Sequence, residues 1–344
     1  MENLLEILAT PKQVGLLIGA GVSKACGLTN VADLTKSVRE IITNEKFNEL
    51  LDEKDNIETI LNKVQQLKSL IGDKPVNELT LATVLEIEIE IKKTIFEKLS
   101  VDQPIDKLSD LVVWLNFING EYQKEIFSLN YDLLLEKSLE HNSLPYFSGF
   151  IGNVKPFFIS DSVDDFSGLY VKQSWTKLWK LHGSLNFKKS ATEQIFIENN
   201  INSDYENLLI YPSMDKYLSS RKAPFIAYLD RFRKYLLVNE KVLLILGYSF
   251  CDDHVNDIII NGLNNNSRLS IFAFCYDEQT LNKCLEVLGK YPNISAYADK
   301  FKFVNKAKSK FETEKNIGDF NNFIEVINSL VNQKSGEIIN SSIK

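Results

Sequence analysis

The chain has 344 residues, of which 44% are hydrophobic and 25% are charged, and its net charge is −7. These values are typical of a globular protein with a sizeable core, and the negative charge argues against direct nucleic-acid binding. No apolar run reaches the roughly 18 residues of a membrane span, and the start of the chain lacks the basic region of a signal peptide, so we expect a cytoplasmic protein with no membrane contact. None of the four cysteines has CxxC spacing, so reduced thiols are expected and a zinc ribbon is not.

The first predicted strand, Val14–Ile18, runs directly into Gly19, Ala20 and Gly21, and Ser23 stands in the first turn of the helix that follows. A strand that turns on glycines into a helix directs backbone N–H groups and the helix dipole at one point, as in a pyrophosphate cradle. The segment lacks the third glycine of GxGxxG and the GKS or GKT of a Walker loop. A tight turn without a ligand is therefore the alternative.

Apolar residues at helical spacing predict a block of helices over Ala32–Thr43, Phe47–Ile71, Leu79–Leu99 and Leu108–Ile118. The third range also alternates like a strand, but its glutamates and flanking leucines favour a helix. Residues 44–120 are too long for a single crossover between strands. We therefore predict an inserted helical subdomain over these residues.

Strands and helices alternate through the rest of the chain, with strands at Glu125–Leu129, Thr176–Leu181, Val242–Leu246 and Leu269–Cys275. The segments between and after them are predicted in chain order as a helix at Leu133–Glu140, a hairpin from Leu185–Lys188, extended pieces at Gln194–Glu198 and Leu208–Tyr211, a helix at Pro224–Val238, a helix at Asp253–Ile260, a polar turn at Gly262–Ser267, and helices at Gln279–Leu288 and Asp319–Val331. This alternation predicts an α/β fold with a Rossmann-like doubly wound parallel sheet.

The predicted elements divide the chain into three parts. Residues 1–43 and 121–300 are assigned to the Rossmann domain, residues 44–120 to the helical insertion, and residues 301–344 to a C-terminal helix and a loose tail.

Polar or glycine residues follow four of the predicted strands, at Gly19–Ser23, Asn130–Asp132, His182–Ser184 and Gly247–Ser249. Ligands of doubly wound sheets bind at the carboxyl ends of the strands. We therefore expect these four segments to meet at one rim of the sheet.

The residues of this rim have alternative roles. Asn130 and Asp132 suit hydrogen bonds to ribose hydroxyls, while an Asx-type turn or a helix cap also explains Asp132. His182 suits a general base, and a hydrogen-bonded core histidine is the alternative. His254 is interpreted as a helix cap or a neighbour of a phosphate or adenine. No ligand spacing supports a metal site, so no metal is expected.

A Ser-His-Asp hydrolase is a competing interpretation of the same rim. Its GxSxG elbow is matched by Gly247 and Ser249, but Cys251 stands where the last glycine belongs. This departure makes the hydrolase a weaker hypothesis than a nucleotide site.

Four segments in the same order resemble the motifs of the sirtuin-like superfamily: GAGVS at 19–23, SLNYD at 128–132, KLHGS at 180–184 and GYSFCDDH at 247–254. They are similar in particular to the sirtuin-like NAD hydrolase domains of bacterial antiviral defence. The resemblance implies a catalytic set and an NAD-binding set, namely Asn130, His182 and Asp132 for catalysis, and Gly19, Ala20, Gly21, Ser23, Gly247 and Ser249 for NAD.

The resemblance implies that NAD is hydrolysed as a substrate to nicotinamide and ADP-ribose, with depletion of cellular NAD as an anti-phage response. It also implies a homo-oligomer and a partner such as a HerA-type ATPase or an Argonaute-like protein, with residues 44–120 as the candidate interface. Because the paired CxxC motifs of deacetylases are absent, a zinc-less protein deacylase is only an alternative. A non-catalytic NAD or ADP-ribose sensor is the other.

Overall fold

The computed structural model describes residues 8, 13–72, 74–120, 122–164, 171–199, 205–210, 222–311 and 315–342, with side chains up to residue 331 in the last helix. Nine of the described strands form one sheet. Their bounds are β1 Val14–Ile18, β2 Lys124–Ser128, β3 Tyr146–Phe147, β6 Thr176–Lys180, β10 Val242–Leu246, β11 Ser270–Phe274, β12 Ile294–Ala298, β13 Phe301–Val304 and β14 Ala307–Lys310.

The strand order of this sheet is β14-β13-β12-β11-β10-β1-β2-β6-β3. All neighbours pair in parallel except β12 with β13 and β13 with β14. Each of β1, β2, β6 and β10 is buried along its whole length, as expected of central strands covered on both faces. The predicted doubly wound parallel sheet is confirmed.

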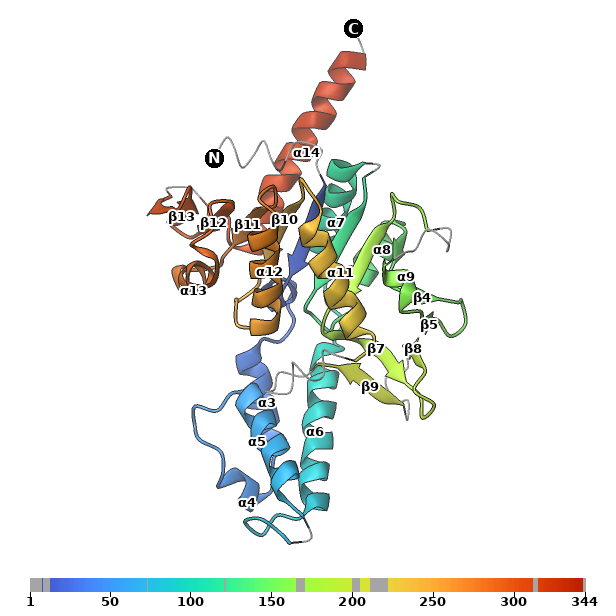
Figure 1. Ribbon diagram of the computed structural model, residues 1–344, viewed down its shortest axis with the longest axis vertical. Helices are drawn as coiled ribbons and strands as arrows, with labels where there is room; N and C mark the ends of the chain where they lie inside the picture. Colours follow the sequence, from blue (N-terminus) through green and yellow to red (C-terminus); the bar gives the residue numbers. More distant parts are fainter. Residues whose placement is uncertain are drawn as a thin grey trace.

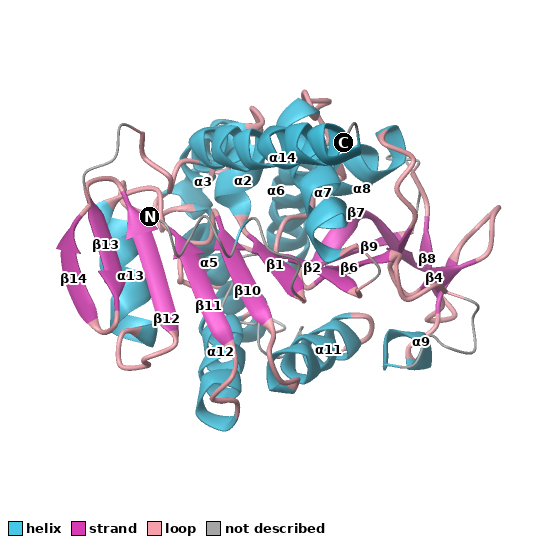
Figure 2. Cartoon of the chain, turned by 90° about the horizontal axis from the view of Figure 1, so that it is seen from above, coloured by secondary structure: helices cyan, strands magenta, loops and turns pink. Residues whose placement is uncertain are grey.

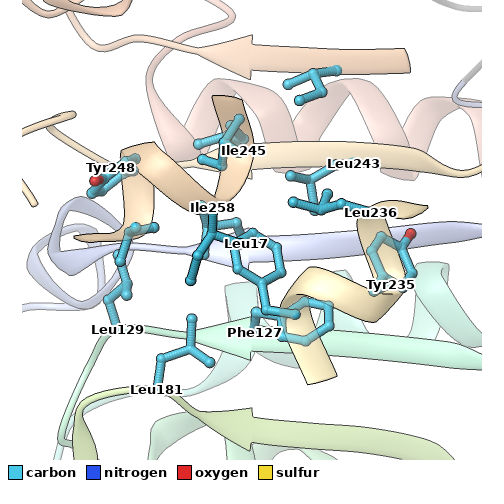
Figure 3. Packing of buried hydrophobic residues seen from close by; sticks show 14 of the residues in the cluster. Leu17, Phe127, Leu129, Leu181, Tyr235, Leu236, Leu243, Ile245, Tyr248 and Ile258 are labelled. Atoms are coloured by element: carbon cyan, nitrogen blue, oxygen red, sulfur yellow. The ribbon is translucent and has the colours of Figure 1, made fainter. Parts of the chain in front are cut away.

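Helices cover both faces of the sheet (Figure 2). One face carries α2 Ala20–Ala25, α7 Asp106–Asn119, α8 Leu134–His141 and α14 Phe320–Ser342, and the other carries α9 Asp161–Asp164, α11 Phe225–Leu237, α12 Asp253–Asn265 and α13 Glu278–Leu288. Successive side chains of β1 point to opposite faces, because Leu17 packs in the cluster of α11 and α12 while Leu16 and Ile18 pack in that of α7 and α14. Figure 3 shows Leu17 with Phe127 and Ile258 in the first cluster.

A group of helices lies beyond the carboxyl end of β1, at the opposite end of the molecule from the C-terminal helix α14 (Figure 1). Its members are α3 Val31–Ile41, α4 Glu45–Asn48, α5 Ile57–Leu70 and α6 Leu81–Leu99. They share a separate hydrophobic cluster in which Val38, Val64 and Ile91 are fully buried. The division of the chain into domains stays a prediction, although α7 packs on the sheet rather than in this group.

The single helix predicted over Phe47–Ile71 is wrong, because the chain leaves the helical path between α4 and α5. Asn56 caps α5, its side-chain oxygen accepting a hydrogen bond from the Thr59 N–H at 3.0 Å. The buried Asp55 carboxylate accepts bonds from the Asp52 N–H at 2.7 Å and from Lys63 Nζ at 2.6 Å. Asparagine and aspartate thus break the helix by bonding its backbone locally.

A second sheet has five strands in the order β4-β5-β8-β7-β9. Its bounds are β4 Phe150–Ile151, β5 Phe157–Phe158, β7 Gly183–Lys189, β8 Ile195–Ile197 and β9 Glu206–Leu209. The strand predicted at Leu185–Lys188 does form a hairpin, since β7 pairs antiparallel with β8. Its strands β4 and β5 precede β6 in the chain, whereas β7 follows β6 directly, so the chain passes from the large sheet to the second one at His182.

The C-terminal region differs from the prediction of a helix and a loose tail. The strands β13 and β14 form an antiparallel hairpin that extends the large sheet beyond residue 300, and α14 continues to Ser342. The polar turn predicted from Gly262 is also wrong, because Gly262 lies inside α12. Among the described residues, no helix is long and apolar enough to cross a membrane.

Candidate functional site

The four strands whose ends carry the predicted site residues are immediate neighbours, in the order β10-β1-β2-β6. Backbone hydrogen bonds continue the ladder past the strand ends. The Leu181 N–H donates to Ser128 O at 2.8 Å, and the Gly19 N–H donates to Leu246 O at 2.9 Å. The segments that carry His182, Asn130, Gly19 and Gly247 therefore lie side by side at one edge, and the predicted meeting of these segments is confirmed.

The glycine turn after β1 packs directly on the turn after β10. A Cβ on Gly19 would lie 2.5 Å from Gly247 O, and a Cβ on Gly21 would lie 2.8 Å from Gly247 Cα. Gly247 has a φ of +65°, and its own Cβ would meet Val22 N at 2.5 Å. The three glycines are thus required by the packing of two turns, whatever ligand they bind.

The same turn presents part of its backbone at the rim. Ala20 and Gly21 are exposed, whereas Gly19 is buried. The Gly21 N–H already donates to Gly247 O at 2.9 Å. A bound pyrophosphate would therefore have to use other N–H groups of this turn or displace that bond.

Ser23, Asn130 and Asp132 form one buried hydrogen-bond network. Ser23 Oγ donates to Asp132 Oδ2 at 2.6 Å, and Asn130 Nδ2 donates to Ser23 Oγ at 2.7 Å and to Gly19 O at 3.1 Å. Asp132 Oδ1 also accepts a bond from the Leu134 N–H at 3.1 Å, which confirms the predicted Asx-type turn. The carboxylate of Asp132 therefore orients Asn130 through the hydroxyl of Ser23.

His182 lies where the chain passes from β6 to β7 and is 4% exposed. Two backbone bonds fix this segment, from the Ile210 N–H to His182 O and from the Leu185 N–H to Tyr131 O, both at 2.9 Å. The second bond ties the segment to the loop that carries Asn130. His182 and the serine–asparagine network therefore occupy adjacent positions at the rim.

The sequence, in which His254 is interpreted as a helix cap or a neighbour of a phosphate or adenine, does not predict that His254 contacts His182. Its Nε2 lies 3.0 Å from His182 Nε2, with the ring centroids 5.1 Å apart. The residue at the cap position of α12 is Asp252 rather than His254. One ligand atom from each of these three residues lies within 4.8 Å of the others. In the sequence, the position of His254 at the end of the GYSFCDDH segment is the signal that could have placed it near the site.

The other predicted residue after β10, Ser249, is exposed in the loop that leads to α12. The neighbouring Tyr248 is buried, and its hydroxyl donates to Asn256 Oδ1 at 2.9 Å. This bond anchors the loop against α12 and leaves Ser249 at the surface. A contact of Ser249 with a nucleotide stays a prediction.

Burial controls the ionisation of the groups beneath the rim. Burial, together with the neighbouring Asp132 charge, raises the pKa of the Cys26 thiol to about 11, so Cys26 is neutral at pH 7. Burial also raises the pKa of Glu136, although Lys180 Nζ lies 3.4 Å away. Cys26 is therefore a poor nucleophile here.

A cavity of about 190 Å³ lies beside Asp132, between the end of α6, the start of α8 and β7. Phe96, Leu133 and Leu185 give it an apolar lining. Two further lining residues, Asn186 and Glu198, each carry a buried oxygen without a hydrogen-bond partner among the described residues. The cavity thus offers both apolar and polar surface next to the Asp132 network.

The fold and the rim define a doubly wound α/β domain whose first turn is glycine-rich and whose neighbouring strand ends carry asparagine, aspartate and histidine. Residues 124–297 match the sequence family described as the SIR2-like domain, which is just over half of the chain. The chain therefore belongs to the SIR2-like domain family. This confirms the sirtuin-like resemblance, while membership in the defence group stays a prediction.

Solved structures of similar fold agree with this family. A Sir2 homologue in complex with NAD aligns over 97% of this chain and 94% of its own, with a TM-score of 0.51 and 12% identity. Two mutants of a Sir2 homologue with ADP-ribose, one serine-to-alanine and one histidine-to-asparagine, also have a TM-score of 0.51 and 12% identity. The alignment covers 97% of this chain and 98% of each mutant. At this identity the likeness shows the fold. No curated protein matches the chain.

Proposed function

We propose that this protein is an NAD hydrolase that cleaves the bond between nicotinamide and ribose, releasing nicotinamide and ADP-ribose. The observation that carries the proposal is the buried Ser23–Asn130–Asp132 network beside His182 at four adjacent strand ends. The bound NAD and ADP-ribose named for the solved structures of similar fold support the choice of ligand.

In this proposal the ribose carbon passes through an oxocarbenium-like state as nicotinamide leaves. His182 accepts a proton from the attacking water or from a ribose hydroxyl. Asn130 positions the ribose or the water, and Asp132 holds Asn130 in place through Ser23. The pyrophosphate of NAD, which is the substrate, would face Gly19, Ala20, Gly21 and Ser23. Gly247 and Ser249 would lie on the other side of it.

A nicotinamide-release assay tests the proposal. We expect His182→Ala and Asn130→Ala to lower the rate by roughly 10²-fold or more, the usual weight of a positioned acid–base group. His141→Ala is the matched control, because His141 is an exposed histidine at the end of α8. Cleavage by both site variants at the wild-type rate would contradict the assignment.

Regulation is part of the proposal, since uncontrolled NAD loss is toxic to a cell. We infer an anti-phage effector that is held inactive until a second copy, or a partner such as a HerA-type ATPase or Argonaute-like protein, engages it. The assay is therefore run at several protein concentrations, with and without the product of the neighbouring gene. Tight NAD binding without turnover in every state would favour the sensor, and turnover of acyl-lysine peptide would favour the deacylase.

A further inference from the structure

We propose that His182, His254 and Asp252 bind a divalent transition-metal ion, and that this metal switches off NAD cleavage. The second half of the proposal rests on the proposed hydrolase function. The metal site itself rests only on geometry, since these three residues from two different strand ends bring their ligand atoms within 4.8 Å of one another. We take Zn²⁺ as the ion for the test.

The two imidazoles already face each other through the atoms that would bind the metal. Their Nε2 atoms are 3.0 Å apart, whereas two nitrogens bound tetrahedrally to one zinc at about 2.0–2.1 Å are roughly 3.3 Å apart. A shift of a few tenths of an ångström thus converts the contact into a metal-binding pair. The two ring planes are inclined at 34° to each other, and each ring must also turn so that both Nε2 lone pairs point at one ion.

The donor set selects the class of metal. Two imidazole nitrogens and one carboxylate are ligands of zinc and related transition metals, and three protein ligands leave a position open. Magnesium and calcium prefer sites made of oxygen atoms. Neither Cys26 nor Cys251 belongs to the cluster, so the site is not a thiolate site.

The surroundings provide charge and access. Asp252 and His254 are partly exposed while His182 is buried, so an ion could enter from the rim. The positive end of the α12 dipole lies next to His254 and opposes a cation. The carboxylates of Asp252 and Asp253, both at the start of that helix, offset it.

Metal binding and catalysis by His182 exclude each other. A neutral imidazole has one nitrogen that accepts and one that donates. If Nε2 of His182 binds the metal, its remaining nitrogen carries hydrogen and accepts no proton. The base proposed for NAD cleavage is then lost, and removal of the metal restores it.

The first experiment measures metal binding without NAD. The full chain is stripped with a chelator, titrated with Zn²⁺ by calorimetry, and analysed for zinc per chain after desalting. We expect one ion per chain. We expect His254→Ala to weaken binding by roughly tenfold or more, because even an outer-shell partner of a metal is worth 10- to 100-fold in affinity. Asp252→Asn, which preserves the side-chain shape, should weaken it as well.

Two matched controls locate the site. His141→Ala removes the exposed histidine on α8, and Cys251→Ser removes the exposed thiol beside Asp252. Both should bind zinc like the wild type. Binding that survives in both His254→Ala and Asp252→Asn, or that is lost in Cys251→Ser, overturns the site.

The second experiment compares nicotinamide release with and without Zn²⁺ within each variant. The wild type should be inhibited and then rescued by chelator, while His254→Ala should keep its own metal-free rate when zinc is added. Zinc binding at the cluster with undiminished wild-type cleavage overturns the switch. Zinc binding without NAD cleavage in any state supports the site and contradicts the proposed hydrolase instead, so the two proposals fail separately.

Discussion

Ser23 connects the candidate catalytic residues to the glycine turn. Its hydroxyl accepts a hydrogen bond from Asn130 and donates one to Asp132, and all three side chains are at most 8% exposed. A buried polar group that loses its partner costs more than an average hydrogen bond contributes. Ser23 should therefore matter for stability as much as for chemistry.

We expect Ser23→Ala to lower the free energy of unfolding by about 1–3 kcal/mol, because it leaves the Asp132 carboxylate and the Asn130 amide without that partner. Nicotinamide release should fall as well, since Asn130 loses its orientation. Urea denaturation measures the first effect. Ser69→Ala, which removes an exposed hydroxyl on α5, is the control. Equal stability and activity in both variants would show that the network is unimportant.

Lys177 is fully buried in β6, and its ammonium donates to the carbonyls of Lys172, Gln173 and Trp175 at 2.8–3.0 Å. Burial, with smaller contributions from the charges of Lys124 and Arg231, lowers its pKa from 10.5 to about 8. The folded chain thus releases this proton at a lower pH than the unfolded chain does.

Above pH 8 the unfolded state therefore holds more protons at Lys177 than the folded state, so this group makes stability rise with pH. Between pH 7.5 and 10 we expect the wild type to gain on the order of 2 kcal/mol relative to Lys177→Met, which has no proton to release. Urea unfolding of both proteins at several pH values measures the difference. A constant difference across this range would mean that Lys177 keeps an ordinary pKa.

The sequence predicts several of the candidate site residues but not all of the contacts between them. Asn130, Asp132 and His182 can be predicted because they lie just after two predicted strands, which become the central strands β2 and β6. The sequence favours a helix cap for His254 and does not predict its contact with His182. The two residues are 72 positions apart, so their contact depends on how α12 is placed against β6. No local periodicity encodes that distance.

At the scale of elements, the turns after β1 and β10 behave as one unit. The Gly21 N–H donates to Gly247 O at 2.9 Å, and both glycines approach too closely for a Cβ. A methyl group at either position must move backbone rather than a flexible side chain. This contact fixes the distance between the two turns that the proposed dinucleotide would bridge.

We expect Gly21→Ala to destabilise the protein by about 1–3 kcal/mol, the usual effect of adding a methylene group to a packed site. NAD affinity, measured by calorimetry, should fall with it. Gly72→Ala is the matched control, since nothing lies within 4 Å of the Cβ it would add. Should the two variants melt at the same temperature, the close packing of the turns would be contradicted.

Elements with strong periodicity are predictable, and those set by contacts are not. The strands β1 and β10 are apolar along their whole length because helices cover both faces of the sheet, so their sequence alone indicates them. Gly262 resembles a turn residue in the sequence, yet it sits inside α12 where a Cβ would meet Leu236 Cβ of α11 at 2.7 Å. The hairpin of β13 and β14 is rich in exposed lysine, which conceals its strand pattern.

At the scale of the whole molecule, parallel strand pairing explains why the sequence alone predicts a rim. Carboxyl ends of parallel strands lie at one edge, so four polar strand ends far apart in sequence are expected to meet. The structure shows in addition that these four strands are immediate neighbours, in the order β10-β1-β2-β6. The sequence pattern alone does not predict this order. The helical group of α3 to α6 lies beyond this edge (Figure 1).

One face of α6 carries a row of exposed apolar side chains. Leu81, Leu85 and Ile89 lie four residues apart on one side of the helix, and they are 41%, 38% and 64% exposed. The opposite side of α6 is buried in the helical group through Val84 and Ile91. Exposed apolar rows of this kind mark interaction surfaces, and we predict that a second copy of the chain, expected from the sequence to bind within residues 44–120, contacts this one.

Leu85→Glu combined with Ile89→Glu should therefore lower the molar mass measured by light scattering to that of a single chain. The melting temperature should stay close to that of the wild type, because both side chains point away from the helical cluster. Val154→Glu is the control, since Val154 is fully exposed but far along the chain from α6. If oligomerisation activates the proposed hydrolase, nicotinamide release by the double variant should no longer rise with protein concentration. A wild-type mass of one chain at every concentration would contradict the assignment of this face.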